Sequence, residues 1–151
     1  MAKYFFDTDT LNSLVRKDSQ HHKKVMNKIL SLKGEGELFT SILSLYEMEY
    51  GVQHCKEEYK ALAKKAVHAV IDNPNLTVLP LTERGAEIFG ELKEAYQQNR
   101  TLGKKAIQKY NIDFMIASLA IEIEGILVSG DGVFKDIQDF RTDFRYENWH
   151  E

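Results

Sequence analysis

Cysteine, proline and long apolar segments are scarce in this sequence, and each scarcity excludes a class of protein. The single cysteine, Cys55, cannot form a disulfide within the chain and leaves no Cys-x-x-Cys pair for zinc or redox chemistry. With 2 prolines, 43% hydrophobic and 28% charged residues, the 151-residue chain is typical of an ordinary globular protein rather than a disordered one. No apolar run approaches the roughly 20 residues that span a bilayer, and Asp7 and Asp9 occupy positions where a signal peptide is apolar. We therefore expect one cytoplasmic domain over residues 1–151, with no membrane contact.

The sequence also lacks an excess of positive charge. The formal net charge is −3, whereas domains that coat nucleic acid without specificity are normally strongly basic. An RNA substrate would therefore have to meet a local basic patch. The best candidate for such a patch comprises Arg100, Lys104, Lys105 and Lys109, although a charged segment of this kind is equally compatible with plain solvated surface.

Several motifs that mark well-known chemistries are missing. The chain has no Walker loop, no GxGxxG fingerprint, no serine within a GxSxG elbow and no HExxH motif among its five histidines. These absences exclude nucleotide switches, dehydrogenases and esterases of the usual types.

Short apolar strands alternate with helical segments along the whole chain. Strands are predicted at Tyr4–Phe6, Leu38–Thr40, Thr77–Leu79 and Ile126–Val128, with a last one near Phe144–Trp149. Helices are predicted between them, including one opened by Ser44, one over Glu57–Ile71, one capped by Thr82 and one over Ile112–Glu124. This alternation indicates βαβ units, and hence a three-layer α/β/α domain with a mostly parallel sheet. In such a sheet the ligand site lies beyond the carboxyl ends of the strands, where the strand order reverses.

Four acidic residues are expected at that edge of the sheet. Asp7 and Asp131 directly follow strands, while Glu47 and Asp113 fall in the first turns of predicted helices. Each has a purely structural explanation as well: Asp7 as a helix cap, Asp131 as a turn residue, Glu47 as the capping-box partner of Ser44, and Asp113 as an anion favoured by the helix dipole. Gathered together, however, four carboxylates would repel one another unless cations neutralised them, and hard oxygen ligands select Mg²⁺ or Mn²⁺. Such a site suits phosphodiester hydrolysis, because a bound metal makes hydroxide available and can stabilise the leaving oxygen.

The same segments resemble the PIN-domain family, and within it the VapC-type toxins of toxin–antitoxin pairs. The resemblance rests on Phe5–Thr8, Ser41–Gly51, Ile112–Ala117, Leu127–Asp131, Phe134 and the closing Glu147–Trp149. It implies that the catalytic, metal-binding residues are Asp7, Glu47, Asp113 and Asp131, supported by Thr8, Asp9 and Ser129. It also implies a Mg²⁺- or Mn²⁺-dependent endoribonuclease that cleaves RNA, forms a homodimer and is held inactive by a cognate antitoxin protein. Two features depart from the family pattern: Asp9 stands where asparagine is frequent, and the stretch 100–111 is longer than in compact toxins.

The first of these motifs also resembles the nucleophile motif of haloacid dehalogenase-like phosphatases. In a phosphatase of that type Asp7 would attack phosphorus and Asp9 would act as general acid. Only 20 residues follow Asp131, too few for the helix and strands that this family places after its distal metal motif. The phosphatase hypothesis also leaves Glu47 and Asp113 without a role, so we favour the nuclease.

Three further protein classes share parts of the pattern. A signalling receiver domain would need a phosphoacceptor aspartate after the strand that ends at Thr40, where Ser41 stands instead. A PIN-domain nuclease that processes RNA without being a toxin stays open. A degenerate PIN domain that only binds protein is disfavoured by the retention of all four acids.

Overall fold

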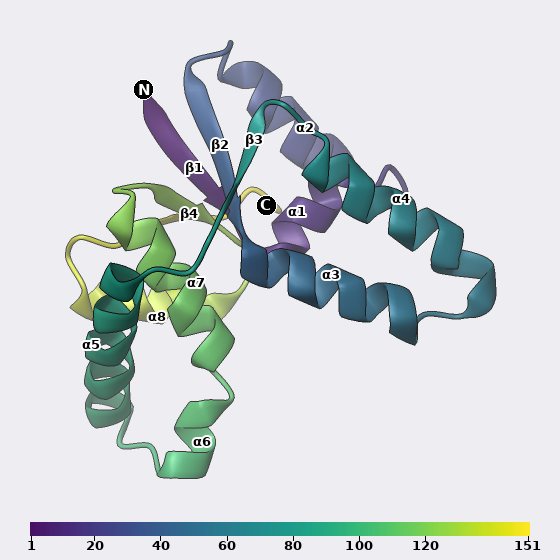
Figure 1. The fold of residues 1–151 in the computed structure, drawn as a ribbon. Coiled ribbons are helices and arrows are strands. Elements are labelled where there is room, and N and C mark those ends of the chain that lie inside the picture. The colour runs from purple at the N-terminus through teal and green to yellow at the C-terminus, as the bar shows by residue number, and fades with distance from the viewer.

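Five parallel strands form the centre of the structure, a computed structural model that describes all 151 residues (Figure 1). They are β1 (Ala2–Phe6), β2 (Gly36–Ser41), β3 (Leu76–Leu79), β4 (Ile126–Val128) and β5 (Arg145–Glu147). Their order across the sheet is β3-β2-β1-β4-β5, and every neighbouring pair is parallel. The predicted parallel α/β arrangement is confirmed.

Helices cover both faces of this sheet (Figure 1). One face carries α1 (Thr8–Val15), α2 (His22–Ser31), α3 (Ile42–His54) and α4 (Lys60–Ile71), the last preceded by a single 3-10 turn at Glu57–Tyr59. The other face carries α5 (Glu83–Arg100), α7 (Asn111–Glu122) and α8 (Gly132–Phe140), while the short α6 (Lys104–Gln108) joins α5 to α7 beyond the sheet. None of these helices combines the length and the apolar character that a membrane crossing requires.

Two adjacent phenylalanines of β1 show how the layers are held together. Successive side chains of a strand point to opposite faces, so Phe5 and Phe6, both fully buried, enter different clusters. Phe5 packs in a cluster with residues of α5, α7 and α8, such as Phe114. Phe6 packs in a second cluster with residues of α1, α3 and α4, and its ring lies 5.5 Å from that of Trp149. Each face of the sheet therefore has its own core.

The strand order reverses between β1 and β4. From β1 the chain moves to β2 and then β3 on one side, whereas β4 and β5 lie on the other side. Phe6 pairs with Val128 at the carboxyl ends of β1 and β4, and the amide of Asp7 donates to the carbonyl of Val128 at 3.2 Å. The residues that follow these two strands thus lie side by side at the switch point, where open α/β sheets bind ligands.

Two helices lie in segments for which the sequence pattern predicts no element. Helix α6 has only five residues, too few for an apolar period to show. Helix α8 begins immediately after Gly130-Asp131-Gly132, which has the composition of a turn. Asp131 instead caps a helix there, and Val133, Phe134 and Ile137 of that helix are buried.

Candidate functional site at the carboxyl edge of the sheet

Asp7 lies at the end of β1 and is buried, with 6% of its surface exposed. One carboxylate oxygen accepts a hydrogen bond from the amide of Thr10 at 2.9 Å, which caps α1 as predicted. The other oxygen accepts from the hydroxyl of Ser129 at 2.5 Å. Burial raises the pKa of Asp7 to about 6, although the hydrogen bonds from Ser129 and Thr10 act in the opposite direction. Each oxygen has a second lone pair, so capping leaves the carboxylate able to bind a further partner.

Ser129 connects the first and last aspartates of the predicted site. It is fully buried at the end of β4, where its hydroxyl donates to Asp7 and accepts from the amide of Asp131 at 3.0 Å. Asp131 itself is exposed and caps α8 by accepting from the amide of Val133 at 3.2 Å. Ser129 therefore fixes the orientation of Asp7 and the backbone of Asp131 at the same time.

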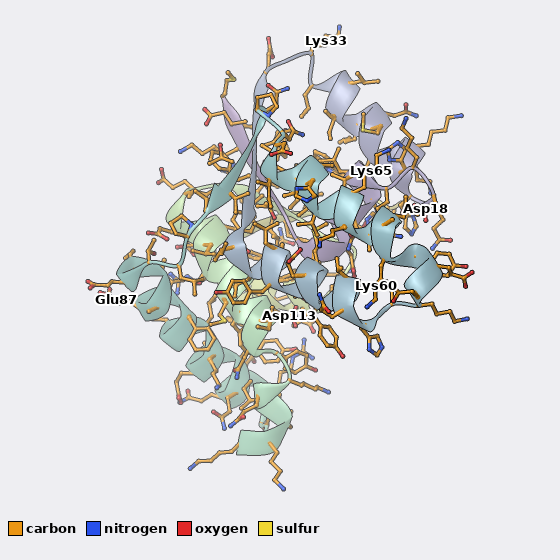
Figure 2. The ribbon with its side chains drawn as sticks, turned by 45° about the vertical axis from the view of Figure 1, so that its right-hand side comes forward. Asp18, Lys33, Lys60, Lys65, Glu87 and Asp113 are labelled. Atoms are coloured by element: carbon orange, nitrogen blue, oxygen red, sulfur yellow. The ribbon has the colours of Figure 1, made fainter.

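The pKa of Asp113 depends on the charges of the other three predicted acids. Asp113 lies in the first turn of α7 and is half-buried (Figure 2). Burial is the largest cause that raises its pKa to about 7, followed by the charges of Asp131, Asp7 and Glu47. The structure thus brings all four predicted acids to one edge, although they come from four separate segments of the chain.

The structural role predicted for Glu47 is wrong. Helix α3 begins at Ile42 and is capped by Ser41, whose hydroxyl accepts from the amide of Ser44 at 3.4 Å. Glu47 therefore lies in the second turn, beyond the reach of a capping box with Ser44. Its carboxylate accepts instead from the hydroxyl of Thr8 at 2.6 Å. This contact ties the start of α1 to α3 and gives Thr8, predicted only as a supporting residue, a defined partner.

Ser44 was not predicted as a neighbour of the acids. It is fully buried, and its hydroxyl lies 3.0 Å from that of Thr8. Since Thr8 has a single hydroxyl proton, which the charged carboxylate of Glu47 attracts more strongly, Ser44 can donate to Thr8 in turn. The helical spacing of Ser44 and Glu47, three residues apart, would have placed both on one face if the start of the helix had been assigned correctly.

The donor set fits a hard divalent cation in type and in charge. All the donors are carboxylate oxygens, and the strongest charge effects on Asp113 come from other carboxylates rather than from a neutralising cation. No three acidic, histidine or cysteine side chains lie close enough to form a ready-made metal cluster. Glu47 and Asp131 are exposed, so a dissolved cation can reach both carboxylates.

Asp9 lies close to the same edge. It is exposed in the first turn of α1, and its charge contributes to raising the pKa of both Asp7 and Asp113. The sequence predicts Asp9 as a supporting residue, and the structure places it within electrostatic range of Asp7 and Asp113.

The four basic residues predicted to contact RNA do not form one free patch. Arg100 is paired with Asp136 at 2.7 Å, and the ammonium of Lys109 lies 5.0 Å from the centre of the Tyr110 ring. Lys104 and Lys105 are exposed on α6. RNA contact by these residues stays a prediction.

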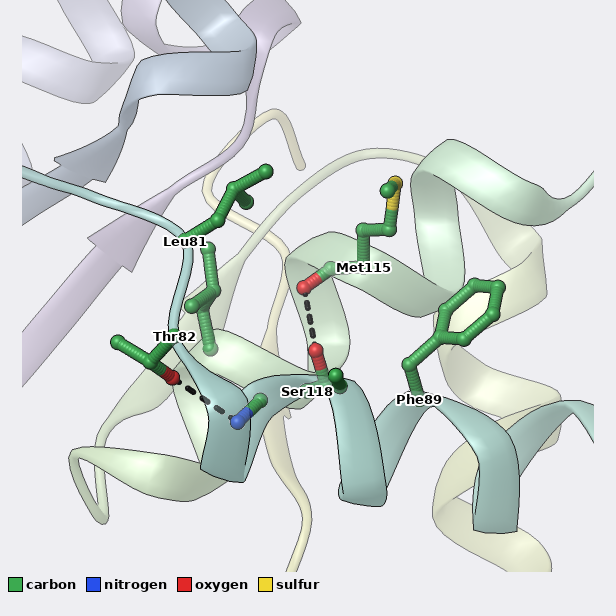
Figure 3. A pocket seen from close by; sticks show the side chains of 8 residues that line it. Leu81, Thr82, Phe89, Met115 and Ser118 are labelled. Atoms are coloured by element: carbon green, nitrogen blue, oxygen red, sulfur yellow. Dashed lines mark hydrogen bonds between the residues drawn. The ribbon is translucent and has the colours of Figure 1, made fainter.

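A separate cavity of about 120 Å³ lies between α5 and α7 (Figure 3). Its wall is mostly apolar and includes Leu81, Phe89 and Met115. Its two polar side chains are already paired: Thr82 accepts from the amide of Gly85, and Ser118 donates to the carbonyl of Met115. No titratable group lines this cavity, so it offers no chemistry comparable to that of the acidic edge.

Several solved structures share this fold. A chain of VapBC2 from Rickettsia felis, bound to a DNA fragment from its promoter, has a TM-score of 0.72 and 23% identity over 97% of this chain and 98% of that chain. A chain of VapBC-1 from nontypeable Haemophilus influenzae has a TM-score of 0.72 and 18% identity over 99% of both chains. VapBC-5 of Mycobacterium tuberculosis, a member of a family of toxin–antitoxin systems, has a TM-score of 0.67 and 16% identity over 98% of this chain and 99% of that chain.

The sequence comparisons are consistent with these structural ones. No protein of curated function matches the chain in sequence. The sequence pattern of the PIN domain matches residues 4–139, a span that contains all four acids and Ser129. Because this match covers most of the sequence, the chain belongs to the PIN domain family.

Proposed function

We propose that this protein is a Mg²⁺- or Mn²⁺-dependent endoribonuclease and the toxin of a toxin–antitoxin pair. The observation that supports the proposal most strongly is the position of Asp7, Glu47, Asp113 and Asp131 at one edge of the sheet, where burial and the charges of the other three acids raise the pKa of Asp113 to about 7. Acids that interact in this way at the switch point of a parallel sheet are suited to binding a cation, and the phosphodiester backbone of RNA is a substrate on which a cation can act. Membership of the PIN domain family and the likeness to VapBC structures agree with this chemistry.

The four acids and two neighbouring hydroxyl groups would have different roles in this reaction. Asp7, Glu47, Asp113 and Asp131 would hold the cation, which supplies a hydroxide nucleophile at neutral pH and stabilises the leaving oxygen when bound. The hydroxyl of Ser129 keeps Asp7 in one orientation, and the hydroxyl of Thr8 does the same for Glu47. Because the pKa of Asp113 is raised to about 7, part of the metal-free protein carries a proton on this carboxyl near neutral pH, and binding a cation would displace it.

The proposal includes protein partners, namely a cognate antitoxin and a second copy of the chain. Support comes from solved structures of similar fold, one of a member of the VapBC family of toxin–antitoxin systems and one of a toxin–antitoxin complex from Klebsiella pneumoniae. Large apolar side chains also stand exposed on α4, including Leu62 at 46% and Ile71 at 54%. Light scattering during size-exclusion chromatography should give the mass of a dimer. Co-expression with the protein encoded beside this one should abolish its RNA cleavage.

The direct test is cleavage of single-stranded RNA by the purified protein. We expect cleavage with Mn²⁺, none with EDTA, and a loss of at least a hundredfold in Asp113→Asn and Asp131→Asn. Asp72→Asn is the matched control, because Asp72 is exposed after α4 and precedes β3, at the opposite edge of the sheet. Cleavage by both site variants at the wild-type rate would overturn the proposal.

Asp9 separates this proposal from the phosphatase hypothesis. A phosphatase that uses Asp7 as nucleophile would be crippled by Asp9→Asn, which removes its general acid. The nuclease should tolerate Asp9→Asn with a change of less than about tenfold in RNA cleavage, since Asp9 influences the site only through its charge. Efficient release of phosphate from small phosphomonoesters by the wild type, lost in Asp9→Asn, would favour the phosphatase.

A further inference from the structure

One face of α3 leads outward from the acidic edge. Glu47, Tyr50, Gly51 and His54 are spaced by three, four and seven residues, which places them along one stripe of the helix. At a rise of about 1.5 Å per residue, this stripe extends for about 10 Å along the axis from Glu47 to His54. An extended ligand that lies along the stripe can therefore reach Glu47 at one end and the rings of Tyr50 and His54 at the other.

The two rings of the stripe are stacked on each other in solvent. The ring centres of Tyr50 and His54 lie 5.3 Å apart, and the ring planes differ by 17°. Tyr50 is 67% exposed, His54 is also exposed, and neither belongs to a core cluster. Between them, a side chain at Gly51 would meet no atom within 4 Å, so the stripe is open there. The ring faces turned away from the stack are consequently available to a flat ligand.

We propose that Tyr50 and His54 form a stacking platform for an unpaired RNA base next to the phosphate that is cleaved. The inference rests on the proposed function and adds a substrate contact to it. Exposed aromatic rings bind bases through their faces, and they do so for any base because no hydrogen-bond pattern is read. The bases of a duplex are already stacked and paired, so only a single strand can use the platform.

The surroundings of the platform suit a nucleic acid strand. Lys56, two residues beyond His54, is exposed and has no ion-pair partner, so it can meet a backbone phosphate. Tyr46 is just as exposed, yet it lines the groove between α3 and α4 rather than stacking with another ring. The chain therefore provides its own control, a second exposed tyrosine on the same helix with different neighbours.

The test compares three substitutions in the full chain carrying Asp113→Asn, which binds RNA without cutting it if the proposed function is right. The probe is a single-stranded RNA with 2-aminopurine at successive positions, in Mg²⁺ at low salt. Tyr50→Leu should weaken binding by roughly five- to a hundredfold, as expected for the loss of one base stack. Tyr50→Trp should retain the affinity and the quenching of the base, and Tyr46→Leu should change neither. Duplex RNA should bind Tyr50→Leu and its parent equally.

The outcomes separate the platform from the proposed function. If wild type cleaves RNA but Tyr50→Leu leaves binding and quenching unchanged, the platform is wrong and the nuclease stands. If Tyr50→Leu instead converts a dimer into a monomer and lowers the affinity for duplex RNA equally, the stripe is an interface between two copies. If the parent binds no single-stranded RNA and wild type cleaves none, both proposals fail together.

Discussion

Single residues at the acidic edge serve the fold and the site at once. Asp7 caps α1 with one carboxylate oxygen, and the other oxygen is held by Ser129. Asp131 caps α8 while its charge raises the pKa of Asp113. Because asparagine caps helices about as well as aspartate, an Asp→Asn change at these positions removes charge while retaining the cap.

Ser129→Ala should destabilise the protein in a pH-dependent way. The variant leaves a buried carboxylate of Asp7 without its hydroxyl donor, at a cost of about 1 to 3 kcal/mol in the free energy of unfolding. In the wild type this hydrogen bond lowers the pKa of Asp7. Its loss should therefore raise the folded-state pKa of Asp7 above about 6 in the variant. The stability deficit should therefore be large at pH 8, where Asp7 is charged, and smaller at pH 5. Urea denaturation at the two pH values measures it.

Ser118→Ala is the matched control for this experiment. Ser118 is also buried, but its hydroxyl donates to the carbonyl of Met115 within α7 and contacts no acid. Its stability deficit should be the same at both pH values. An equal, pH-independent deficit in the two variants would mean that Ser129 does not act on Asp7.

At the scale of elements, Ser41 and Glu47 allow the capping of α3 and the chemistry of the site to be tested separately. Ser41→Ala removes the cap of the helix and should cost about 1 kcal/mol in the free energy of unfolding. Glu47→Gln lies outside the cap, so it should change stability by less than about 0.5 kcal/mol while reducing RNA cleavage by at least tenfold. Denaturation curves and cleavage rates on the same preparations check both statements. A Glu47→Gln variant that cleaves RNA at the wild-type rate would remove Glu47 from the site.

The elements themselves could be predicted wherever a segment carries a clear apolar pattern. The sequence predicts strands that overlap all five observed strands, as well as the helix capped by Thr82, whose hydroxyl accepts from the amide of Gly85 at 2.9 Å. The start of α3 could not be assigned, because Ser41 and Ser44 are both good caps and only the end of β2 decides between them. Local sequence does not contain that tertiary information.

The same limit applies to the candidate site. The strand ends place Asp7 and Asp131 at one edge, which the sequence predicts without knowledge of the fold. The contact of Thr8 with Glu47 depends instead on how α1 packs beside α3, over a separation of 39 residues. The stacked pair Tyr50 and His54 gives no sequence signal beyond helical spacing, because exposed rings are common on helices.

At the scale of the whole molecule, the metal-free protein should lose part of its stability as pH rises. The folded-state pKa of Asp113, about 7, lies above its ordinary value of 3.8. Its contribution is therefore fully present below pH 3.8 and disappears as pH rises through 7. Asp113→Asn has no titrating carboxyl at this position, so its free energy of unfolding relative to wild type should increase by about 2 kcal/mol from pH 5 to pH 8. This value is reduced for solvent screening, because Asp113 is only half-buried. Denaturation in EDTA across this range measures the difference.

Thermal melting at neutral pH, with EDTA and with Mn²⁺, shows most directly whether the four acids act together as a cation site. Mn²⁺ at a hundredfold excess over its dissociation constant should stabilise wild type by about 2.7 kcal/mol, or about 5 to 10 °C. Asp113→Asn and Asp131→Asn should melt at or above metal-free wild type, because each removes a source of repulsion, and should respond far less to Mn²⁺. If Mn²⁺ leaves the melting temperature of wild type unchanged, the four acids hold no cation and the account is contradicted.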